Sequence, residues 1–535
     1  MPVRILVTDR VNPTGITLLE AVPGFEVDVL PTLPAEELLE RIGEYDAIIG
    51  RSATKISTEL LRAGRRLRCV GRAGVGVDNV DMDEATRLGI AVINAPAGNT
   101  VAVAELFYGA VIGLLRHIPQ ADGSMHEGRW ERSALTGTEL KGKTLGIIGV
   151  GRIGSEVAQR AQAFGMRILG YDPYVSNDRF LRVRAQRVES LEELLEASDV
   201  VTIHTPLTDE TRGMLSTEEL GHLRDGSVLV NMARGGIIDE DALAVELERG
   251  RLRGAVLDVY AAEPMTGHHA FRDRDDVVLT PHLGASTLES QHNVAVDVCA
   301  GVRDFFLEDD LTRSLNVDVG EFDIPGLPAA ITLARRAAAV ARALLASRGG
   351  TAVGGLTLKI GDDLAPAATV LLSAATAGVL ENVVDAGRLN LINARRVAAE
   401  RGIELGVAAG GVPPHGRALE VRIRAGSLRE RVGGVAPVDT VPRLTRIQDF
   451  HVDVAPRRTL LVLHNRDVPG VIGHVGTALG DAGVNIAEYH QARLAEGGEA
   501  LAVVTVDGLP PRDLADELLG LDDVSMVTVV SFHGD

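Results

Sequence analysis

Three side chains of complementary chemistry stand just after three predicted strands. Arg234 follows SVLVNMA, Glu263 follows GAVLDV, and His282 follows VVLTP. The guanidinium of Arg234 offers a planar fork of donors that fits a carboxylate and can polarise an adjacent carbonyl. Histidine titrates near neutral pH and suits general acid–base work, and Glu263 can pair with His282 and orient its ring. Singly, these are equally a surface charge, a solvated acid and a structural histidine, but their succession at strand ends favours proton and hydride transfer beside a carboxylate.

A glycine-rich segment, GVGRIG at residues 149–154, supplies a second set of groups. Gly149 permits a tight turn, Gly151 lets the backbone approach a pyrophosphate, and Gly154 allows a helix to pack close to a sheet. Asp172 ends the next apolar run, 18 residues after Gly154, where an acid accepts ribose hydroxyls and repels a 2′-phosphate. Alone, such a loop is only a turn and such an acid only a cap. The strand before the loop and the helical pattern after it favour NAD binding.

The elements that must position these groups are short apolar runs separated by helix-like stretches. The first series lies at 3–8, 46–50, 68–71 and 90–93. The second series lies at 144–149, 167–171, 199–204, 227–231, 254–259 and 277–280. The alternation predicts parallel α/β sheets, and the second series has the six strands of a dinucleotide-binding fold. Because ligands bind at the carboxyl ends of such strands, the three catalytic candidates can converge.

The chain continues well past these two series. Residues 326–350 are rich in Ala and Arg, and the following hundred are rich in Ala, Gly and Val. From about residue 456 the pattern reads strand, helix, strand, strand, helix, strand. We therefore expect an α/β protein with two Rossmann-like parallel-sheet domains, an α+β intervening domain and a C-terminal βαββαβ domain.

Length and composition limit the class of protein. With 535 residues, three or four domains are expected. The net charge of −20 argues against nucleic-acid binding. Cys69 and Cys299 form neither a metal-like cluster nor a disulfide framework, and no uncharged apolar run reaches membrane-spanning length. We expect a cytoplasmic protein with no bound metal.

Four motifs together identify a family resemblance: GVGRIG, NMARGGIID, LDVYAAEP and TPHLGAST. They resemble the D-isomer-specific 2-hydroxyacid dehydrogenases. RSATKIS, GRAGVGVDNVD and EGRWERSALTGTELKGKT resemble, more narrowly, the long-form branch that acts on D-3-phosphoglycerate. The resemblance implies NAD-dependent oxidation of D-3-phosphoglycerate to 3-phosphohydroxypyruvate, the first step of the phosphorylated route to L-serine.

The resemblance also implies a discontinuous domain arrangement. Residues 1–97 and 285–316 would form the substrate-binding domain, with the NAD-binding domain, 98–284, inserted between them. Residues 317–452 would form an intervening domain of the allosteric substrate-binding type. Residues 456–535 would form an ACT regulatory domain.

Residue roles follow from the same resemblance. His282 and Glu263 would form the acid–base pair, and Arg234 would bind the substrate carboxylate and carbonyl. The cofactor-binding set would be Gly149, Gly151, Arg152, Ile153, Gly154, Asp172, Thr205, Met232, Ala233, Asp258, Gly284 and Ala285. The substrate-binding set would be Arg51, Ser52, Arg72, Gly74, Asn99 and Arg132, with Lys55 a weaker candidate. Arg132 would reach across from a neighbouring subunit, and Val75 stands where some relatives carry a threonine at the cofactor.

The C-terminal domain adds a predicted effector site. Asp467 would accept the ammonium of L-serine, Asn465 would lie beside it, and Asn485 would contact the ligand from a partner chain. Asp and Asn also form turns, so these residues have a purely structural alternative. The resemblance further implies a homo-oligomer, a tetramer.

Two other functions remain open at this point. One is a dehydrogenase for another D-2-hydroxy acid, such as glyoxylate or hydroxypyruvate, which would not depend on Arg51 and Arg72. The other is a non-catalytic NAD-binding regulator, against which the intact Arg234, Glu263 and His282 argue.

Overall fold

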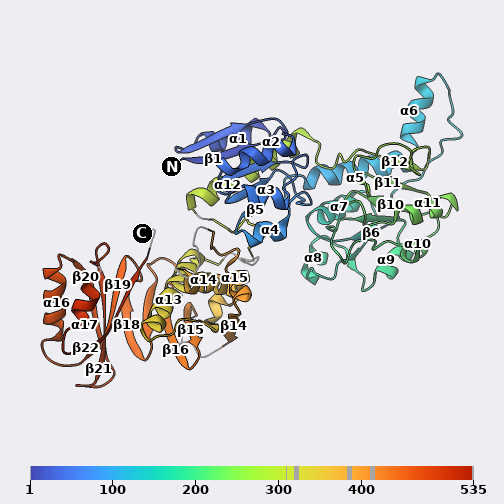
Figure 1. Cartoon of the computed structure of the whole chain (residues 1–535). Helices are drawn as coiled ribbons and strands as arrows, with labels where there is room; N and C mark the ends of the chain where they lie inside the picture. The colour runs from blue at the N-terminus through green and yellow to red at the C-terminus, as the bar shows by residue number, and fades with distance from the viewer. Residues whose placement is uncertain are drawn as a thin grey trace.

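The computed structural model describes residues 2–308, 310–317, 324–381, 388–409, 416–511 and 513–532. Within them the chain forms four sheets in chain order, each with its own helices (Figure 1). Two are wholly parallel, one is mixed and one is antiparallel. The predicted α/β fold class is confirmed.

The N-terminal unit is a parallel sheet of order β2-β1-β3-β4-β5. Its strands are β1 (Val3–Val7), β2 (Phe25–Val29), β3 (Ala47–Gly50), β4 (Cys69–Arg72) and β5 (Ala91–Asn94). Its helices are α1 (Pro13–Glu20), α2 (Ala35–Arg41), α3 (Thr58–Ala63) and α4 (Met82–Arg87), joined by α12 (Leu288–Glu308) from much later in the chain. The strand β2 escaped prediction because it lies at the sheet edge and buries none of its residues fully.

The return of α12 makes this unit discontinuous. The helix packs on α1, β4 and β5. Beyond it, Ser314 forms an isolated bridge with Ile93, and the Asn316 side chain accepts a 3.1 Å hydrogen bond from the Val92 amide. The domain limits inferred from the resemblance remain a prediction, but these contacts place the returning segment against the first sheet.

The central unit is a seven-stranded parallel sheet of order β12-β11-β10-β9-β6-β7-β8. Its strands are β6 (Thr144–Ile148), β7 (Arg167–Tyr171), β8 (Gln186–Arg187), β9 (Val200–Ile203), β10 (Val228–Asn231), β11 (Gly254–Leu257) and β12 (Val277–Leu279). Its helices are α5 (Thr100–Leu115), α7 (Arg152–Ala163), α8 (Asn177–Arg182), α9 (Leu191–Ala197), α10 (Thr217–Gly221) and α11 (Glu240–Glu248). All six predicted strands are present, and the two-residue β8 is additional.

A short helix stands apart from this unit. Helix α6 (Ile118–His126) and the loop after it project away from the central sheet as an arm (Figure 1). The arm exposes Ile118, Met125 and Trp130, the last with 79% of its surface accessible. Large apolar side chains on a projecting element are typical of a protein–protein contact.

The third unit is a mixed sheet of order β14-β13-β15-β16-β17-β18. Its strands are β13 (Gly355–Ile360), β14 (Glu404–Ala409), β15 (Ala418–Ala425), β16 (Leu428–Val435), β17 (Arg443–Ile447) and β18 (Phe450–Val454). Its helices are α13 (Leu327–Ser347), α14 (Ala368–Leu380) and α15 (Ala394–Glu400). Helix α13 packs on one face of β15 and β16, which leaves the opposite face of the sheet open.

The C-terminal unit is an antiparallel sheet of order β20-β21-β19-β22 with two helices. Its elements are β19 (Thr459–Arg466), α16 (Val471–Asp481), β20 (Ile486–Arg493), β21 (Glu499–Val506), α17 (Leu514–Leu519) and β22 (Val524–Ser531). This is the predicted βαββαβ pattern.

One segment, Asp362–Leu380, is long and apolar enough to cross a membrane by length and composition. The segment begins with Asp362 and Asp363, so it is not an uncharged run, and 72% of its most apolar stretch is buried inside the protein. Its helical part, α14, packs against α13, so we describe it as a core helix of the third unit. The arm adds a second candidate only if α5 and α6 count as one span, and they are bent by 65°.

Candidate active site

The predicted acid–base pair is assembled in the structure. His282 Nδ1 lies 2.7 Å from Glu263 Oε2, and roughly half of the imidazole is exposed. The second carboxylate oxygen, Oε1, accepts a 3.0 Å hydrogen bond from the Tyr260 amide. With Nδ1 turned to Glu263, the other ring nitrogen, Nε2, is available to a ligand.

A buried carboxylate holds the loop that carries His282. Asp258 is fully buried, and its oxygens accept hydrogen bonds from the amides of Leu283 and Gly284 at 2.7 and 2.9 Å. The Thr280 hydroxyl donates to it at 2.6 Å. Both oxygens of Asp258 are therefore engaged by the chain itself, on either side of the histidine.

Arg234 comes from the neighbouring loop after β10. Its Nε donates to Asp78 Oδ2 at 2.8 Å, and its Nη1 donates to the Ala233 carbonyl at 2.6 Å. The next residue, Gly235, lies so close to Tyr260 that a Cβ would stand 1.8 Å from the Tyr260 carbonyl oxygen. The loops of Arg234 and of the acid–base pair are thus in contact.

Two further predicted arginines lie near Arg234, at the ends of β3 and β4. Arg51 follows Gly50, which is paired in register with Arg72. Burial lowers the pKa of Arg72 to about 10, and the charges of Arg234 and Arg51 act in the same direction. Its Nε is buried and has no hydrogen-bond partner among the described residues, and a Cβ on Gly74 would stand 1.3 Å from its Nη1. Three neighbouring cations, one of them half-buried with a buried donor that is free, form a site for an anion.

Acidic and amide side chains that were not predicted to act here hold these loops. Asp9, nearly fully buried, accepts 2.8 Å hydrogen bonds from the amides of Arg51 and Thr54. Asn79 Nδ2 donates to the carbonyls of the same two residues, at 2.9 and 2.7 Å. In the sequence, Asp9 directly follows the first apolar run and Asn79 lies in the GVGVDNVD motif. Neither position by itself distinguishes a residue that anchors a loop from a solvated one.

The glycine loop has the geometry that each glycine predicts. Gly149 has φ +91°, a Cβ on Gly154 would stand 2.2 Å from the Gly149 carbonyl oxygen, and a Cβ on Gly151 would meet open space. Arg152 and Ile153 begin α7, and no side chain caps the N-terminus of this helix, so its first amides are free to bind a ligand. Helix and loop together form a cradle for a phosphate group.

The rest of the predicted cofactor site surrounds this loop. Asp172 accepts hydrogen bonds from the amides of Val150 and Tyr174, both at 2.9 Å, which fixes the end of β7 to the loop. The Thr205 hydroxyl is buried with no partner, and its methyl group lies beside Gly149. The preceding His204 is neutral, because burial lowers its pKa to about 3. An open cradle and an orphaned hydroxyl fit a dinucleotide.

The remaining predicted residues have less distinctive places. Met232 and Ala233 are buried after β10, whereas Ala285 is only partly buried in the His282 loop. Ser52 and Lys55 are exposed after β3. Asn99 stands before α5 with a buried Oδ1 that has no hydrogen-bond partner. Arg132 is exposed in the loop that follows α6.

The three predicted effector residues do not meet within one chain. Asp467 and Asn465 lie at one end of the C-terminal sheet, where Asp467 accepts hydrogen bonds from Arg493 and the Gly497 amide, and the Arg493 guanidinium holds the pKa of its carboxyl below the usual range. Asn485 lies at the opposite end, next to Ile486 and hydrogen-bonded to Asp507 at 2.6 Å. Asp467 and Asn485 therefore each have hydrogen-bond partners within their own chain.

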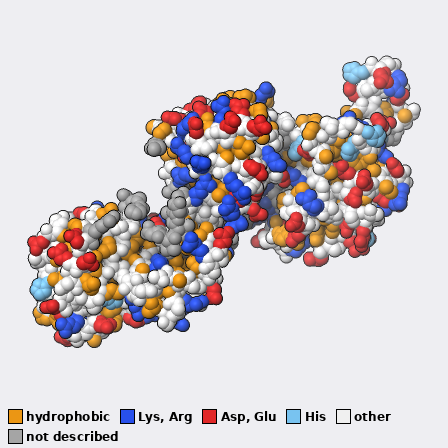
Figure 2. Space-filling view, viewed as in Figure 1, with side chains coloured by type: hydrophobic (Ala, Val, Ile, Leu, Met, Phe, Trp, Pro, Cys, Tyr) orange, Lys and Arg blue, Asp and Glu red, His pale blue; other side chains and the backbone are white. Residues whose placement is uncertain are grey.

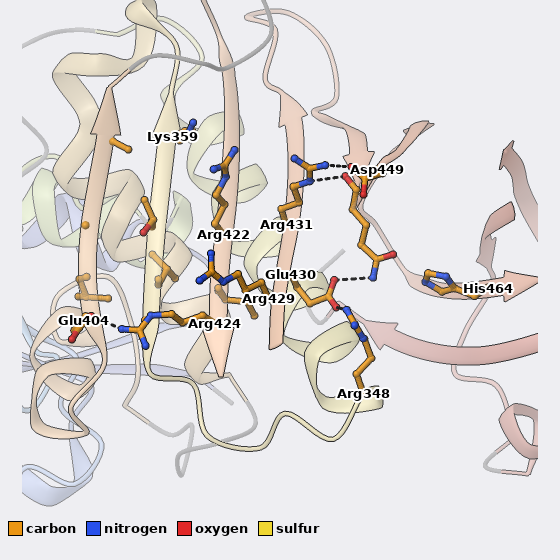
Figure 3. Close-up of a pocket in the computed structure, with 18 of the residues that line it drawn as sticks. Arg348, Lys359, Glu404, Arg422, Arg424, Arg429, Glu430, Arg431, Asp449 and His464 are labelled. Atoms are coloured by element: carbon orange, nitrogen blue, oxygen red, sulfur yellow. Dashed lines mark hydrogen bonds and ion pairs between the residues drawn. The ribbon is translucent and has the colours of Figure 1, made fainter. Parts of the chain in front are cut away.

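A separate basic cavity of about 1070 Å³ lies on the open face of the third sheet and reaches the C-terminal unit (Figure 3). Its cationic lining residues are Arg348, Lys359, Arg422, Arg424, Arg429 and Arg431. Arg424 pairs with Glu404 and Arg431 with Asp449, whereas Lys359 and Arg429 form no ion pair within the part of the chain that the structure describes. At the far wall, His464 has a buried Nε2 without a partner.

Charge is distributed unevenly over the surface as well. On the face in Figure 2, Lys and Arg side chains gather over the N-terminal unit around α3 and α4. A chain with a net charge of −20 thus still gathers cations locally on this face.

The chain is similar to known proteins in two of its segments and along nearly its whole length. Residues 108–284 match the family model "D-isomer specific 2-hydroxyacid dehydrogenase, NAD binding domain", and residues 459–523 match the ACT domain. D-3-phosphoglycerate dehydrogenase of Synechocystis is 38% identical over 96% of this chain and 92% of its own. The enzyme of the same name from Bacillus subtilis is 37% identical over 98% and 99%.

Solved structures resemble more than half of the chain. An NAD⁺-bound 3-phosphoglycerate dehydrogenase of Entamoeba histolytica covers 59% of this chain and 99% of its own, with 30% identity and a TM-score of 0.51. A glyoxylate reductase of Paecilomyes thermophila covers the same shares, with 32% identity and a TM-score of 0.55. Because the sequence relatives match along nearly the whole length, the chain belongs to the D-3-phosphoglycerate dehydrogenase family, within the D-isomer specific 2-hydroxyacid dehydrogenases.

Proposed function

We propose that this protein oxidises D-3-phosphoglycerate to 3-phosphohydroxypyruvate with NAD⁺, the first step of the phosphorylated route to L-serine. The observation that carries the proposal is the cluster of Arg51, Arg72 and Arg234 beside the hydrogen-bonded His282–Glu263 pair. The substrate has a carboxylate and a phosphate, and a three-arginine cluster can neutralise both. The names of the sequence relatives support the same substrate.

The residues divide the reaction between them. Arg234 binds the substrate carboxylate and polarises the developing carbonyl with its remaining donors. His282 Nε2 accepts the proton of the 2-hydroxyl group, and Glu263 holds the ring in position and stabilises the imidazolium that forms. In the reverse reduction the imidazolium returns that proton. NAD⁺, when bound, supplies the hydride acceptor.

The glycine loop and α7 would hold the pyrophosphate of the cofactor, through Arg152, Ile153 and the backbone at Gly151. Asp172 would accept the ribose hydroxyls and reject NADP. The bound cofactor would give the Thr205 hydroxyl a partner, since it has none among the residues that the structure describes. The test is NADH formation by the purified protein with D-3-phosphoglycerate, compared with other D-2-hydroxy acids at equal concentration.

The alternative substrate classes make different predictions in that assay. The similarity to a glyoxylate reductase structure makes a general 2-hydroxyacid dehydrogenase the main alternative. Such an enzyme would turn over D-glycerate as well as the phosphorylated acid and would tolerate loss of Arg72. A non-catalytic regulator would bind NADH and turn over none. We expect a strong preference for the phosphorylated substrate, because an unfilled anion site leaves the Arg72 donor without a partner.

We further propose that L-serine is the effector of the ACT domain. Since Asp467 and Asn485 lie at opposite ends of one sheet, a complete site requires two chains, with Asp467 from one and Asn485 from its partner. A homotetramer meets this requirement, and in it the exposed arm with Trp130 would carry Arg132 to the active site of a neighbouring subunit. Light scattering of the protein and of a Trp130→Ala variant tests the assembly.

We place the protein in the cytoplasm, consistent with its two free, buried cysteines.

The basic cavity suggests a role for the intervening domain. We infer that it binds an anionic, substrate-like ligand, as expected from the resemblance, because Lys359 and Arg429 face it without acidic partners. Titration of the enzyme with inorganic phosphate and with D-3-phosphoglycerate, in the wild type and in Arg429→Gln, tests this role. A second, weaker binding event that the variant abolishes would support it.

A further inference from the structure

An ion pair joins the two sheets that flank the candidate active site. Asp78 lies in the loop after β4 of the N-terminal unit, and Arg234 lies in the loop after β10 of the central unit. Asp78 Oδ2 is 2.8 Å from Arg234 Nε, although 156 positions separate the two residues in the chain. Anything that moves one sheet relative to the other must stretch or reorient this contact.

The pair decides which donors of Arg234 remain for a ligand. Asp78 takes Nε and the Ala233 carbonyl takes Nη1, which leaves Nη2 facing the backbone at Gly76. A Cβ on Gly76 would stand 1.7 Å from that Nη2 and 2.7 Å from Asp78 Oδ2. The loop therefore lies close against the paired guanidinium, and a Cβ at Gly76 would displace Arg234 from this position.

The Asp78–Arg234 pair also offsets the repulsion between two neighbouring arginines. Arg234 lies near Arg72, and the proximity of the two cations lowers the pKa of Arg72, whereas the charge of Asp78 raises it. Without an acid between them, mutual repulsion would push the more exposed Arg234 away from the site. The adjacent Asn79, bound to the carbonyls of Arg51 and Thr54, fixes the loop that carries Asp78.

We propose that Asp78 is a positioning residue for Arg234. It orients the guanidinium so that the free Nη2 faces the substrate carboxylate, and it ties this orientation to the approach of the two sheets. Asp78 itself does not touch substrate in this account. The inference rests on the proposed function, but only on the part that all 2-hydroxy acids share, namely the carboxylate.

The test is steady-state kinetics of Asp78→Asn and Asp78→Glu with whichever D-2-hydroxy acid the wild type turns over. Loss of one charge-assisted hydrogen bond predicts a KM for the hydroxy acid about tenfold higher in Asp78→Asn, with kcat changed by less than about threefold. Asp78→Glu should recover part of the loss. The matched control is Asp83→Asn, which removes an exposed carboxylate from the same segment and should leave both constants unchanged.

Two measurements distinguish a positioning role of Asp78 from a purely structural one. Asp78→Asn should leave both the dissociation constant for NADH and the thermal midpoint unaltered. A double-mutant cycle with Arg234→Lys adds the decisive measurement, because the Asp78→Asn effect should nearly vanish in that background. Additive effects, a KM within twofold of the wild type, or a parallel loss of NADH affinity would each overturn the proposal. Absence of turnover with D-3-phosphoglycerate alone would instead refute the proposed substrate.

Discussion

Replacing Arg72 by glutamine should separate stability from substrate binding. Its pKa falls from 12.5 to about 10, mainly through burial. Because one pKa unit corresponds to about 1.4 kcal/mol, holding this charge without a bound anion costs on the order of 3 kcal/mol. A guanidinium stays protonated at neutral pH, so the empty enzyme carries this cost until an anion binds.

Two results follow for the variant. The thermal midpoint of the empty Arg72→Gln enzyme should equal or exceed that of the wild type, since the lost side chain was incompletely hydrogen-bonded. Its KM for D-3-phosphoglycerate should rise by about 30-fold, the equivalent of roughly 2 kcal/mol of charge-assisted hydrogen bonding. The wild-type midpoint should increase with D-3-phosphoglycerate, and this increase should be lost in the variant.

Differential scanning fluorimetry with and without substrate, together with initial rates of NADH formation, measures both effects. Arg65→Gln is the matched control, because it removes an exposed arginine from the same unit. The reasoning would be refuted by a variant that is destabilised more than the control and is still stabilised by the substrate. That result would make Arg72 a structural residue.

Other variants test the remaining parts of the site. His282→Ala should lower kcat by about 10³-fold and Glu263→Gln by about 10²-fold while NADH binding persists, and near-normal turnover in either would exclude the assigned acid–base pair. Asp172→Ala should raise the KM for NAD⁺ about tenfold and reduce the preference of the enzyme for NAD⁺ over NADP⁺, and rates measured with the two cofactors would show this. Asp9→Asn should raise the KM for the phosphorylated acid but not for an unphosphorylated analogue, because the Arg51 loop loses its anchor; equal effects on both would contradict this. Asp467→Ala should abolish inhibition by L-serine without changing the uninhibited rate, and an unchanged serine titration would reject the effector site.

The buried strands were the most predictable part of the fold. Fully buried parallel strands such as β6 and β10 are uninterrupted apolar runs, and their pattern marks them in the sequence. The strands β2 and β8 were missed because they lie at sheet edges and need no such run. The return of α12 to the first sheet was not visible locally either, because its partners β4 and β5 lie about two hundred residues earlier.

The candidate site divides in the same way. Arg234, Glu263 and His282 were predictable because each carries a recognisable reactive group directly after a strand, where parallel sheets bind ligands. Asp9 and Asp78 were not, because an acid in a loop has no local signature that distinguishes an anchor from a solvated charge. Their roles depend on which main-chain amides and which guanidinium lie opposite, and only the folded chain determines this.

The residues of the candidate site come from two different units of the fold. The residues predicted to do chemistry come from the central unit, whereas Arg51, Arg72 and Asp78 come from the N-terminal unit. Substrate would therefore bind across both sheets, with its carboxylate on Arg234 and its phosphate on Arg51 and Arg72. Because Asp78 bridges to Arg234, the two sheets lie close enough for one short acid to span them. A substrate that lacks the phosphate would satisfy Arg234 and leave the buried Arg72 uncompensated, so discrimination against unphosphorylated acids is expected to arise in the N-terminal unit.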